Sequence, residues 1–472
     1  MTSMHAATKD RQPWLALLVL CLGVLMIVLD TTIVNVALPS IKNDLQFSET
    51  SLVWVVNAYM LTFGGFLLLG GRMGDLYGHR KLFLGGITLF TVTSLACGVA
   101  QSPWMLIVAR GLQGLGGAVV SAVALSLIMN LFTVPAERAK AMGVYGFVCA
   151  GGGSIGVLLG GLLTSSLSWH WIFLVNLPIG IAVYVLCLRL LPAATSRATG
   201  EKLDVAGAVT ITTALMLAVY AIVKGNDVGW SSQQTLLMLG AAAVLLGVFL
   251  VLQARVAQPL MPLGLFRSRN VSVANVVAVL WAAAMFAWFF LSALYMQQVL
   301  NYTPMQVGLA FLPANLIMAA CSLGWSAKLV MVWGNKLPLA CGLLLAAIGL
   351  AWFGRAPVAG GFVEDVLPGM VLLGLGAGIA FNPMLLVAMG DVEPDQSGLA
   401  SGVVNTAFMM GGALGLAVLA SLAAATTAAQ TGAGLDTAEV LNAGYQVAFL
   451  VGAAFAALAA GISYLMLKNA IE

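Results

Sequence analysis

A single acidic residue, Asp30, interrupts the apolar stretch MIVLDTTIVNVALPSI at residues 26–41. Acids within membrane-spanning segments are costly when ionised and are usually functional. A carboxyl group in such a place can take up a proton from one side of a membrane and release it to the other. The sequence therefore favours a proton-coupling or cation-binding role for Asp30. The alternative is a structural acid that is neutral or paired with a polar neighbour such as Asn35.

A single basic residue lies in a similar place, Arg110 in LIVARGLQGLGGA (106–118). A guanidinium group stays charged in proteins, so it must pair with another group or reach water. The partners we expect are Asp30, backbone carbonyl groups and Gln113, one helical turn further on. The alternative is a purely structural charge that locks two helices together.

Uncharged polar residues form a second set of candidates, because each is costly in lipid unless it faces a partner or water. Trp288 and Tyr295 lie at helical spacing in WAAAMFAWFFLSALYMQQ (281–298), and an aromatic face can stack on a lipophilic or cationic ligand. The same pattern more often packs between helices or faces lipid. The predicted substrate cavity contains these two aromatic residues together with Asn35, Asn57, Gln113, Gln297, Asn315, Asn382 and Asn405.

Two further stretches are rich in glycine. GRMGDLYGHRK (71–81) joins two apolar segments, and its glycines permit a tight turn beside a cluster of charges. Such a cluster suits a latch between two bundles, although it also fits a solvated basic loop. GVYGFVCAGGGSIGVLLGGLL (143–163) predicts close helix packing through small residues, among them Gly156, Gly160 and Gly161.

The elements that must position these residues are membrane helices. The 472 residues are 61% hydrophobic and 8% charged, with a mean hydropathy of +1.02. A soluble chain carries about 25% charged residues, so this chain is predicted to be an all-α integral membrane protein embedded in a lipid bilayer. Its small net charge of +3 gives no sign of nucleic-acid binding, no nucleotide-binding motif is visible, and the cysteines show no metal-type spacing.

About fourteen apolar segments are long enough to span a bilayer, taking roughly 20 residues per span. Their approximate limits are 14–38, 51–71, 82–100, 104–132, 139–165, 170–191, 203–223, 233–253, 271–298, 304–327, 337–354, 366–390, 397–424 and 442–467. Asp30 then falls in the second half of the first segment.

An even number of spans places both termini on one side of the membrane. Sixteen basic residues then share that side and three (Lys42, Lys224 and Arg355) lie on the other, which makes the termini cytoplasmic. We expect a cytoplasmic tail at 1–13, a six-helix bundle at 14–191, a linker with two extra transmembrane helices at 192–270, and a second six-helix bundle at 271–472.

Several of these stretches resemble the major facilitator superfamily, in its fourteen-helix drug:proton antiporter branch of EmrB/QacA-like transporters. LDTTIVNVALP (29–39) resembles the first-helix signature of that branch, GRMGDLYGHRK its loop motif and RGLQGLGGA its fourth-helix motif. SWHWIFLVNLPIG (168–180) and SGLASGVVNTAFMMGGALG (397–415) are similar as well. One departure is Val157, where the family motif usually has proline, so a kink at that position is not predicted.

The resemblance implies a major facilitator fold of two six-helix bundles plus two extra helices. It implies proton coupling by Asp30 and Arg110, with Gly114 in the same motif as Arg110. The cytoplasmic gating loop that it implies consists of Gly71, Asp75, Gly78, Arg80 and Lys81.

The function that we expect is export of small amphipathic or lipophilic compounds by multidrug:proton antiport, and hence antibiotic resistance, in the bacterial cytoplasmic membrane. The proton gradient supplies the energy, no cofactor or metal is needed, and a monomer is sufficient. The alternative is an exporter dedicated to one metabolite or antibiotic. A membrane-embedded enzyme or a sensor is a different class, and the scattered histidines His5, His79 and His170 give it little support.

Overall fold

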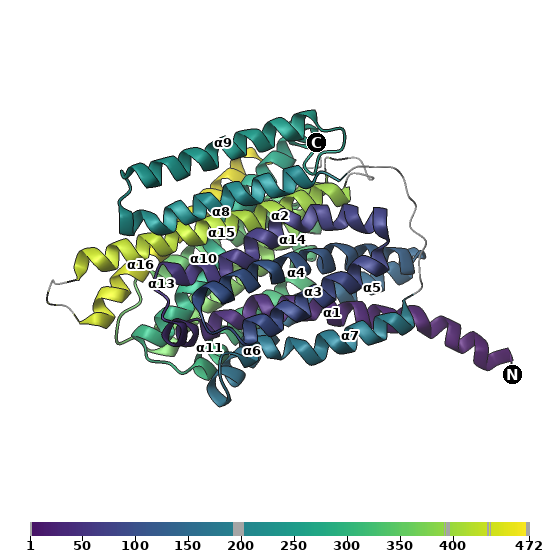
Figure 1. The fold of residues 1–472 in the computed structure, drawn as a ribbon, viewed down its shortest axis with the longest axis horizontal. Coiled ribbons are helices and arrows are strands. Elements are labelled where there is room, and N and C mark those ends of the chain that lie inside the picture. The colour runs from purple at the N-terminus through teal and green to yellow at the C-terminus, as the bar shows by residue number, and fades with distance from the viewer. Residues whose placement is uncertain are drawn as a thin grey trace.

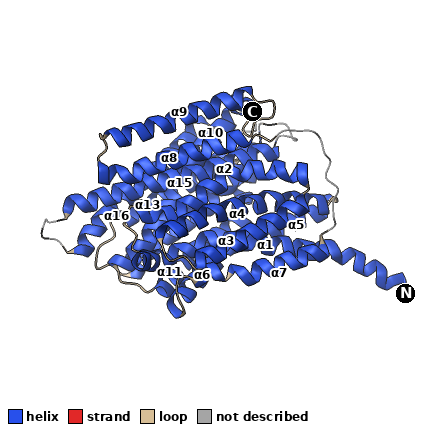
Figure 2. Ribbon diagram, in the orientation of Figure 1, coloured by secondary structure: helices blue, strands red, loops and turns tan. Residues whose placement is uncertain are grey.

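The computed structural model describes residues 2–191, 203–390, 392, 397–431, 434 and 436–468. Within that part of the chain, the regular secondary structure is entirely helical (Figure 2). The side chains of 2–11, Asp75 and several residues of the segment 135–150 lie outside the description.

The first group of helices is called the N-half. It consists of α1 (Thr2–Leu45), the short turn η1 (Ser51–Val53), α2 (Trp54–Tyr77), α3 (His79–Gly98), α4 (Pro103–Leu131), α5 (Pro135–Ser166), α6 (Trp171–Leu174) and α7 (Asn176–Leu190). Two helices follow, α8 (Val205–Val228) and α9 (Gln233–Arg255), and are called the insert.

The second group, the C-half, comes after a short turn η2 (Leu263–Arg267). It consists of α10 (Arg269–Leu294), the π-turn η3 (Tyr295–Val299), α11 (Pro304–Ala320), the π-turn η4 (Cys321–Trp325), α12 (Ser326–Trp333), α13 (Lys336–Phe353), the π-turn η5 (Phe362–Val366), α14 (Leu367–Gly390), α15 (Ser397–Gln430) and α16 (Thr437–Met466).

Local sequence accounts for where several helices begin and end. Ser102 accepts a hydrogen bond from Met105 N and starts α4, and Thr303 and Gln306 form a capping box at the start of α11. Gly78, with φ of +96°, ends α2 and starts the turn to α3. Twelve helical segments in the described chain are long and apolar enough to cross a membrane. The other two predicted spans coincide with α5, of 32 residues, and α11, of 17 residues.

Several span limits differ from the prediction. Helix α1 contains Pro13 and Pro39 within its length and ends only at Leu45. Asp30 therefore lies just past the middle of the apolar segment Gln12–Leu45, at the start of its second half. The span predicted at 304–327 runs on through η4 and α12 to Trp333.

Helix packing brings the halves together along two seams, α5 against α11 and α2 against α15. The insert lies along the second seam: α8 contacts both α2 and α15, while α9 packs mainly on α8 at the edge of the bundle (Figure 1). Helix α1 begins and α16 ends at the same end of the bundle, called here the terminal end (Figure 1). Helix α9 is therefore peripheral, whereas α8 packs against helices of both halves.

Candidate functional site

Asp30 and Arg110 meet inside the N-half. Arg110 Nη1 donates to Asp30 Oδ2 at 2.5 Å, across 80 residues of sequence. Asp30 is 0% exposed and Arg110 is 1% exposed, so the ion pair is sealed from solvent. Two buried charges tolerate such a place only when they neutralise each other and are well hydrogen-bonded.

Two amides complete the shell of the carboxylate. Gln113 Nε2 donates to Asp30 Oδ1 at 2.8 Å, and Asn176 Nδ2 donates to the same oxygen at 3.1 Å. Both amides also reach Ser94 Oγ, at 2.8 and 3.4 Å respectively, and Ser94 itself donates to Phe90 O. We call Asp30, Arg110, Gln113, Ser94 and Asn176 the polar cluster; its members come from α1, α3, α4 and α7.

Arg110 is held by several groups besides the carboxylate. Its Nε donates to Val55 O of α2 at 2.9 Å, and its Nη1 donates to Gln113 Oε1 at 2.7 Å. The guanidinium carbon lies 4.5 Å from the centre of the Tyr59 ring and 5.6 Å from that of Phe173, within the range of cation–π attraction. The arginine is therefore held by α2, α4 and two aromatic rings as well as by its counter-ion.

Small residues let these helices approach closely. A methyl group on Gly114 would overlap the Tyr59 carbonyl oxygen, so glycine is what allows α4 to bring Arg110 against α2. Gly156 and Gly160 of α5 lie in the same way against the backbone of α1 at Leu29 and Ile33. Helix α1 is thus packed tightly on both sides of Asp30.

Three members of the polar cluster, Asp30, Arg110 and Gln113, were predicted from the sequence, and two were not. Arg110 has each kind of partner predicted for it: Asp30, a backbone carbonyl and Gln113. The predicted neighbour Asn35 was wrong, because its amide donates to Thr31 O and Thr32 O of its own helix at 3.4 Å. Ser94 and Asn176 were not predicted. Asn176 is an uncharged polar residue within a predicted span, so the rule that selected Asn57 would have selected it too.

The other polar candidates bind backbone groups and do not converge on one place. Two of them join the halves, since Asn57 donates to Ala413 O and Gln297 donates to Val36 O, both at 2.8 Å. Asn382 donates to Ser322 O at 2.7 Å and Asn405 to Ser401 O at 3.0 Å, both within the C-half. Their place in a substrate cavity stays a prediction.

The two aromatic candidates are buried in this conformation. Trp288 is 1% exposed and packs against Phe289 and Phe311, while the Tyr295 hydroxyl donates to Pro357 O at 2.8 Å. Asn315 is buried as well, and its Nδ2 has no partner among the described residues.

Three phenylalanines of the C-half, which the sequence did not single out, form an aromatic group. The ring of Phe408 (α15) lies 5.7 Å from that of Phe286 (α10) and 5.9 Å from that of Phe381 (α14), both edge-on. Phe286 also borders Gly412, next to Met60 of α2. Phe286 therefore places one edge of this aromatic group at the seam between the halves.

Arg80, at the start of α3, ties the predicted gating motif to α7. Arg80 Nη2 donates to Leu188 O of α7 at 2.8 Å, which holds the loop to its own half. Gly78 forms the turn with its positive φ, Gly71 lies near Ala122 of α4, and Lys81 is exposed. The side chain of Asp75 lies outside the described residues, so the predicted latch between bundles stays a prediction.

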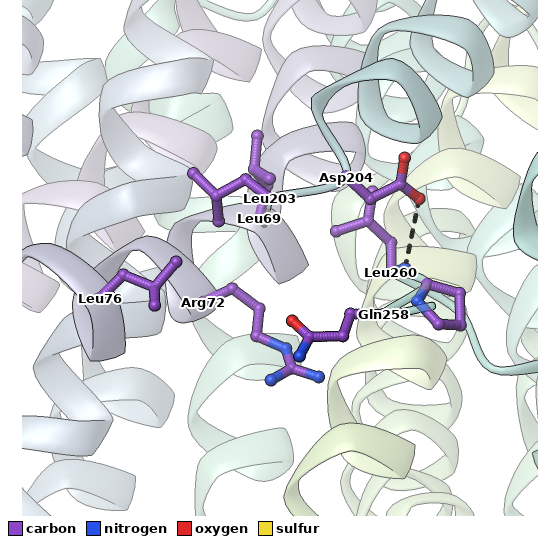
Figure 3. Close-up of a pocket in the computed structure, with 8 residues that line it drawn as sticks. Leu69, Arg72, Leu76, Leu203, Asp204, Gln258 and Leu260 are labelled. Carbon is purple, nitrogen blue, oxygen red and sulfur yellow. Dashed lines mark hydrogen bonds between the residues drawn. The ribbon is translucent and has the colours of Figure 1, made fainter. Parts of the chain in front are cut away.

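A small pocket lies between the end of α2 and the connectors of the insert (Figure 3). Asp204 lines this pocket. Its carboxylate accepts hydrogen bonds from Gly207 N at 2.8 Å, Gln253 Nε2 at 2.6 Å and Leu260 N at 3.5 Å. Asp204 thereby fastens the start of α8 to the end of α9 and to the chain that follows. We call this the Asp204 clasp.

A second small pocket lies at the opposite end from the termini. Glu49, from the connection between α1 and η1, borders it beside apolar residues of α10, α15 and α16. Glu49 also pairs with Lys42, so its charge is already neutralised within the N-half.

Comparison with known proteins identifies the family. The sequence profile of the Major Facilitator Superfamily matches residues 20–416. The puromycin resistance protein pur8 of Streptomyces alboniger is 36% identical over 98% of this chain and 93% of its own length. The cephamycin export protein CmcT of Amycolatopsis lactamdurans is 37% identical over 90% of each chain, and the multidrug resistance protein Stp of Mycobacterium tuberculosis is 36% identical over 88% and 77%.

Solved structures agree on the fold. A POT family peptide transporter superposes with a TM-score of 0.67 over 98% of both chains at 17% identity. The nucleoside transporter NupG superposes with a TM-score of 0.66 over 96% of this chain at 11% identity. The chain belongs to the Major Facilitator Superfamily.

Proposed function

We propose that this protein exports small amphipathic or lipophilic compounds in exchange for protons. Membership of the superfamily makes the chain a multi-pass membrane transporter, and its relatives are named as antibiotic and multidrug export or resistance proteins. The observation that carries the coupling proposal is the sealed Asp30–Arg110 pair. The protein lies in the bacterial cytoplasmic membrane with both termini in the cytoplasm, and works as a monomer without a cofactor.

The pair gives a physical reason for coupling. Protonation of Asp30 would leave Arg110 as a buried charge without a counter-ion, a state that costs several kcal/mol. Helices α1 and α4 can relieve that cost by rearranging until Arg110 meets water or another anion. Occupation of Asp30 by a proton is thereby linked to the change of access that moves substrate across the membrane.

The aromatic group supplies a surface suited to lipophilic compounds. Phe286, Phe381 and Phe408 come from three helices of the C-half, and Phe286 lies beside Gly412 and Met60 at the seam with the N-half. Aromatic faces accept apolar and cationic groups without demanding one hydrogen-bond pattern. This surface fits a broad substrate range better than it fits one polar metabolite.

The direct test is uptake into proteoliposomes that contain no nucleotide. With an imposed pH gradient, a fluorescent lipophilic cation should accumulate, and a protonophore should abolish the accumulation. Mutual competition among chemically unrelated compounds supports the multidrug function, whereas competition by one compound and its close analogues supports a dedicated exporter. Accumulation that persists after the gradient has collapsed contradicts proton coupling.

A further inference from the structure

Every neighbour of the Asp30 carboxylate in the polar cluster is a hydrogen-bond donor. Oδ2 accepts from Arg110, and Oδ1 accepts from Gln113 and Asn176. This arrangement suits an ionised carboxylate, which only accepts. A protonated carboxyl group also has an O–H that must donate a hydrogen bond. The three groups that bond to Asp30 all donate to it, so that hydrogen has no acceptor in this arrangement.

The cluster contains one acceptor that is not in use. Asn176 is only 1% exposed, and its Oδ1 has no hydrogen-bond partner among the described residues. Gln113 Oε1 already accepts from Arg110 and lies 3.7 Å from Cys97 Sγ. Ser94 Oγ already accepts from both amides and donates to Phe90 O.

We propose that Asn176 is a positioning residue that adapts the site to both protonation states of Asp30. Half a turn of its amide group exchanges Nδ2 for Oδ1 beside the carboxyl oxygen. The amide then accepts from the protonated acid where it had donated to the ionised one. This inference rests on the proposed uptake of a proton by Asp30, and it adds the group that receives the new hydrogen bond.

Apart from Asn176, the side chains that bond to the Asp30 carboxylate in the described chain are Arg110 and Gln113, and neither offers a free acceptor. The charged or titratable side chains facing it in the described chain are Arg110 of α4, Tyr59 of α2 and Cys97 of α3. Arg110 is only a donor, and the Tyr59 hydroxyl lies against Gly117 of α4. Helix α5 presents Gly152, Gly156 and Gly160 to α1, and these have no side chain to offer.

The experiment is infrared difference spectroscopy on the purified full chain, between acidic and alkaline pH. The carbonyl stretch of protonated Asp30 is the band that disappears in Asp30→Asn. In Asn176→Leu, which keeps the volume but removes the amide, we expect that band to move to higher frequency, because the carboxyl group loses a hydrogen-bond partner. Asn176→Ser, whose hydroxyl is too short to replace the amide, should show the same shift if the leucine variant does not fold.

Asn442→Leu is the matched control. Asn442 is also a buried asparagine with an unpartnered Oδ1, but it lies on α16 and donates to Ala356 O. This variant should leave the Asp30 band in place. An unchanged band in both Asn176 variants overturns the inference. The absence of any Asp30 band in the unmodified protein instead overturns the proposed proton uptake itself.

Discussion

The Asp30–Arg110 pair is a buried ion pair that is costly to leave incomplete. Each charge is tolerated because the other is present, and Gln113 and Asn176 satisfy the remaining lone pairs of the carboxylate. A pair of this kind adds little stability in itself, since both charges have lost their water. Its proposed role is functional: Asp30 can be ionised and paired with Arg110, or protonated and neutral.

Removing only the arginine should therefore be strongly destabilising. In Arg110→Gln, Asp30 remains buried without a counter-ion, and we expect the free energy of unfolding to fall by about 3–5 kcal/mol. Thermal unfolding in detergent at neutral pH would measure this. The double variant Asp30→Asn with Arg110→Gln should recover much of the loss, because neither charge remains. A loss below about 1 kcal/mol in Arg110→Gln would show that the pair is not sealed as described.

Part of the polar cluster could be predicted from sequence, for an understandable reason. Asp30 and Arg110 are charged residues in apolar stretches and are conspicuous in any hydropathy pattern. Ser94 is not, because a helical serine can bond the carbonyl four residues earlier, as it does here with Phe90. Asn35 and Asn405 both donate from their amides to carbonyl groups of their own helix, so the cost of a polar group in lipid, which was the reason for selecting them, is reduced without a ligand.

Helix packing around α1 depends on glycine at particular positions. Gly156 faces the backbone of α1 at Leu29, one residue before Asp30, whereas Gly151 on the same helix faces open space. Alanine is the better helix former by about 1 kcal/mol, so the two positions should respond to the same substitution with opposite sign.

We expect Gly151→Ala to leave stability unchanged or to raise it slightly. Gly156→Ala should lower the unfolding temperature and impair export, because its methyl group would overlap Leu29 O and Thr32 Oγ1. Thermal unfolding and drug-driven proton movement measured on both variants would check this pair. Equal tolerance of alanine at both positions would contradict the packing of α5 on α1.

The insert is fastened at its base by the Asp204 clasp. In Asp204→Ala, α8 loses its N-cap and Gln253 loses its acceptor, so we expect a loss of about 1–3 kcal/mol in unfolding free energy. Proton coupling per folded molecule should stay unchanged, because the clasp is separate from the polar cluster. Loss of coupling in folded Asp204→Ala protein would give the insert a part in the transport cycle itself.

Apolar length and charge bias were sufficient to predict the order of the helices. All fourteen predicted spans coincide with helical segments of the described chain. The observed ends differ from the predicted ones where a helix continues past its apolar core, as α1 does beyond Pro39. Which helices touch was not predictable in the same way. The seam of α5 with α11 depends on Gly161 meeting Pro304, a contact between residues far apart in sequence.

That seam offers a test of the movement between the halves. Met305 N donates to Ser165 Oγ at 3.1 Å, directly between α5 and α11. Cysteines introduced by Ser165→Cys and Met305→Cys, in a chain cleared of its native cysteines, should cross-link under oxidation and stop export. Reduction should restore export, and each single variant should stay active. Full export by the cross-linked protein would contradict an alternating movement at this seam.

The central claim is that a proton on Asp30 drives transport. The most direct measurement places purified protein in liposomes with a pH-sensitive dye inside and imposes a substrate gradient. Substrate moving one way should drive protons the other way in the unmodified protein, and Asp30→Asn should abolish that proton movement. Unchanged proton movement in folded Asp30→Asn protein would contradict the account, because the coupling group would then lie elsewhere.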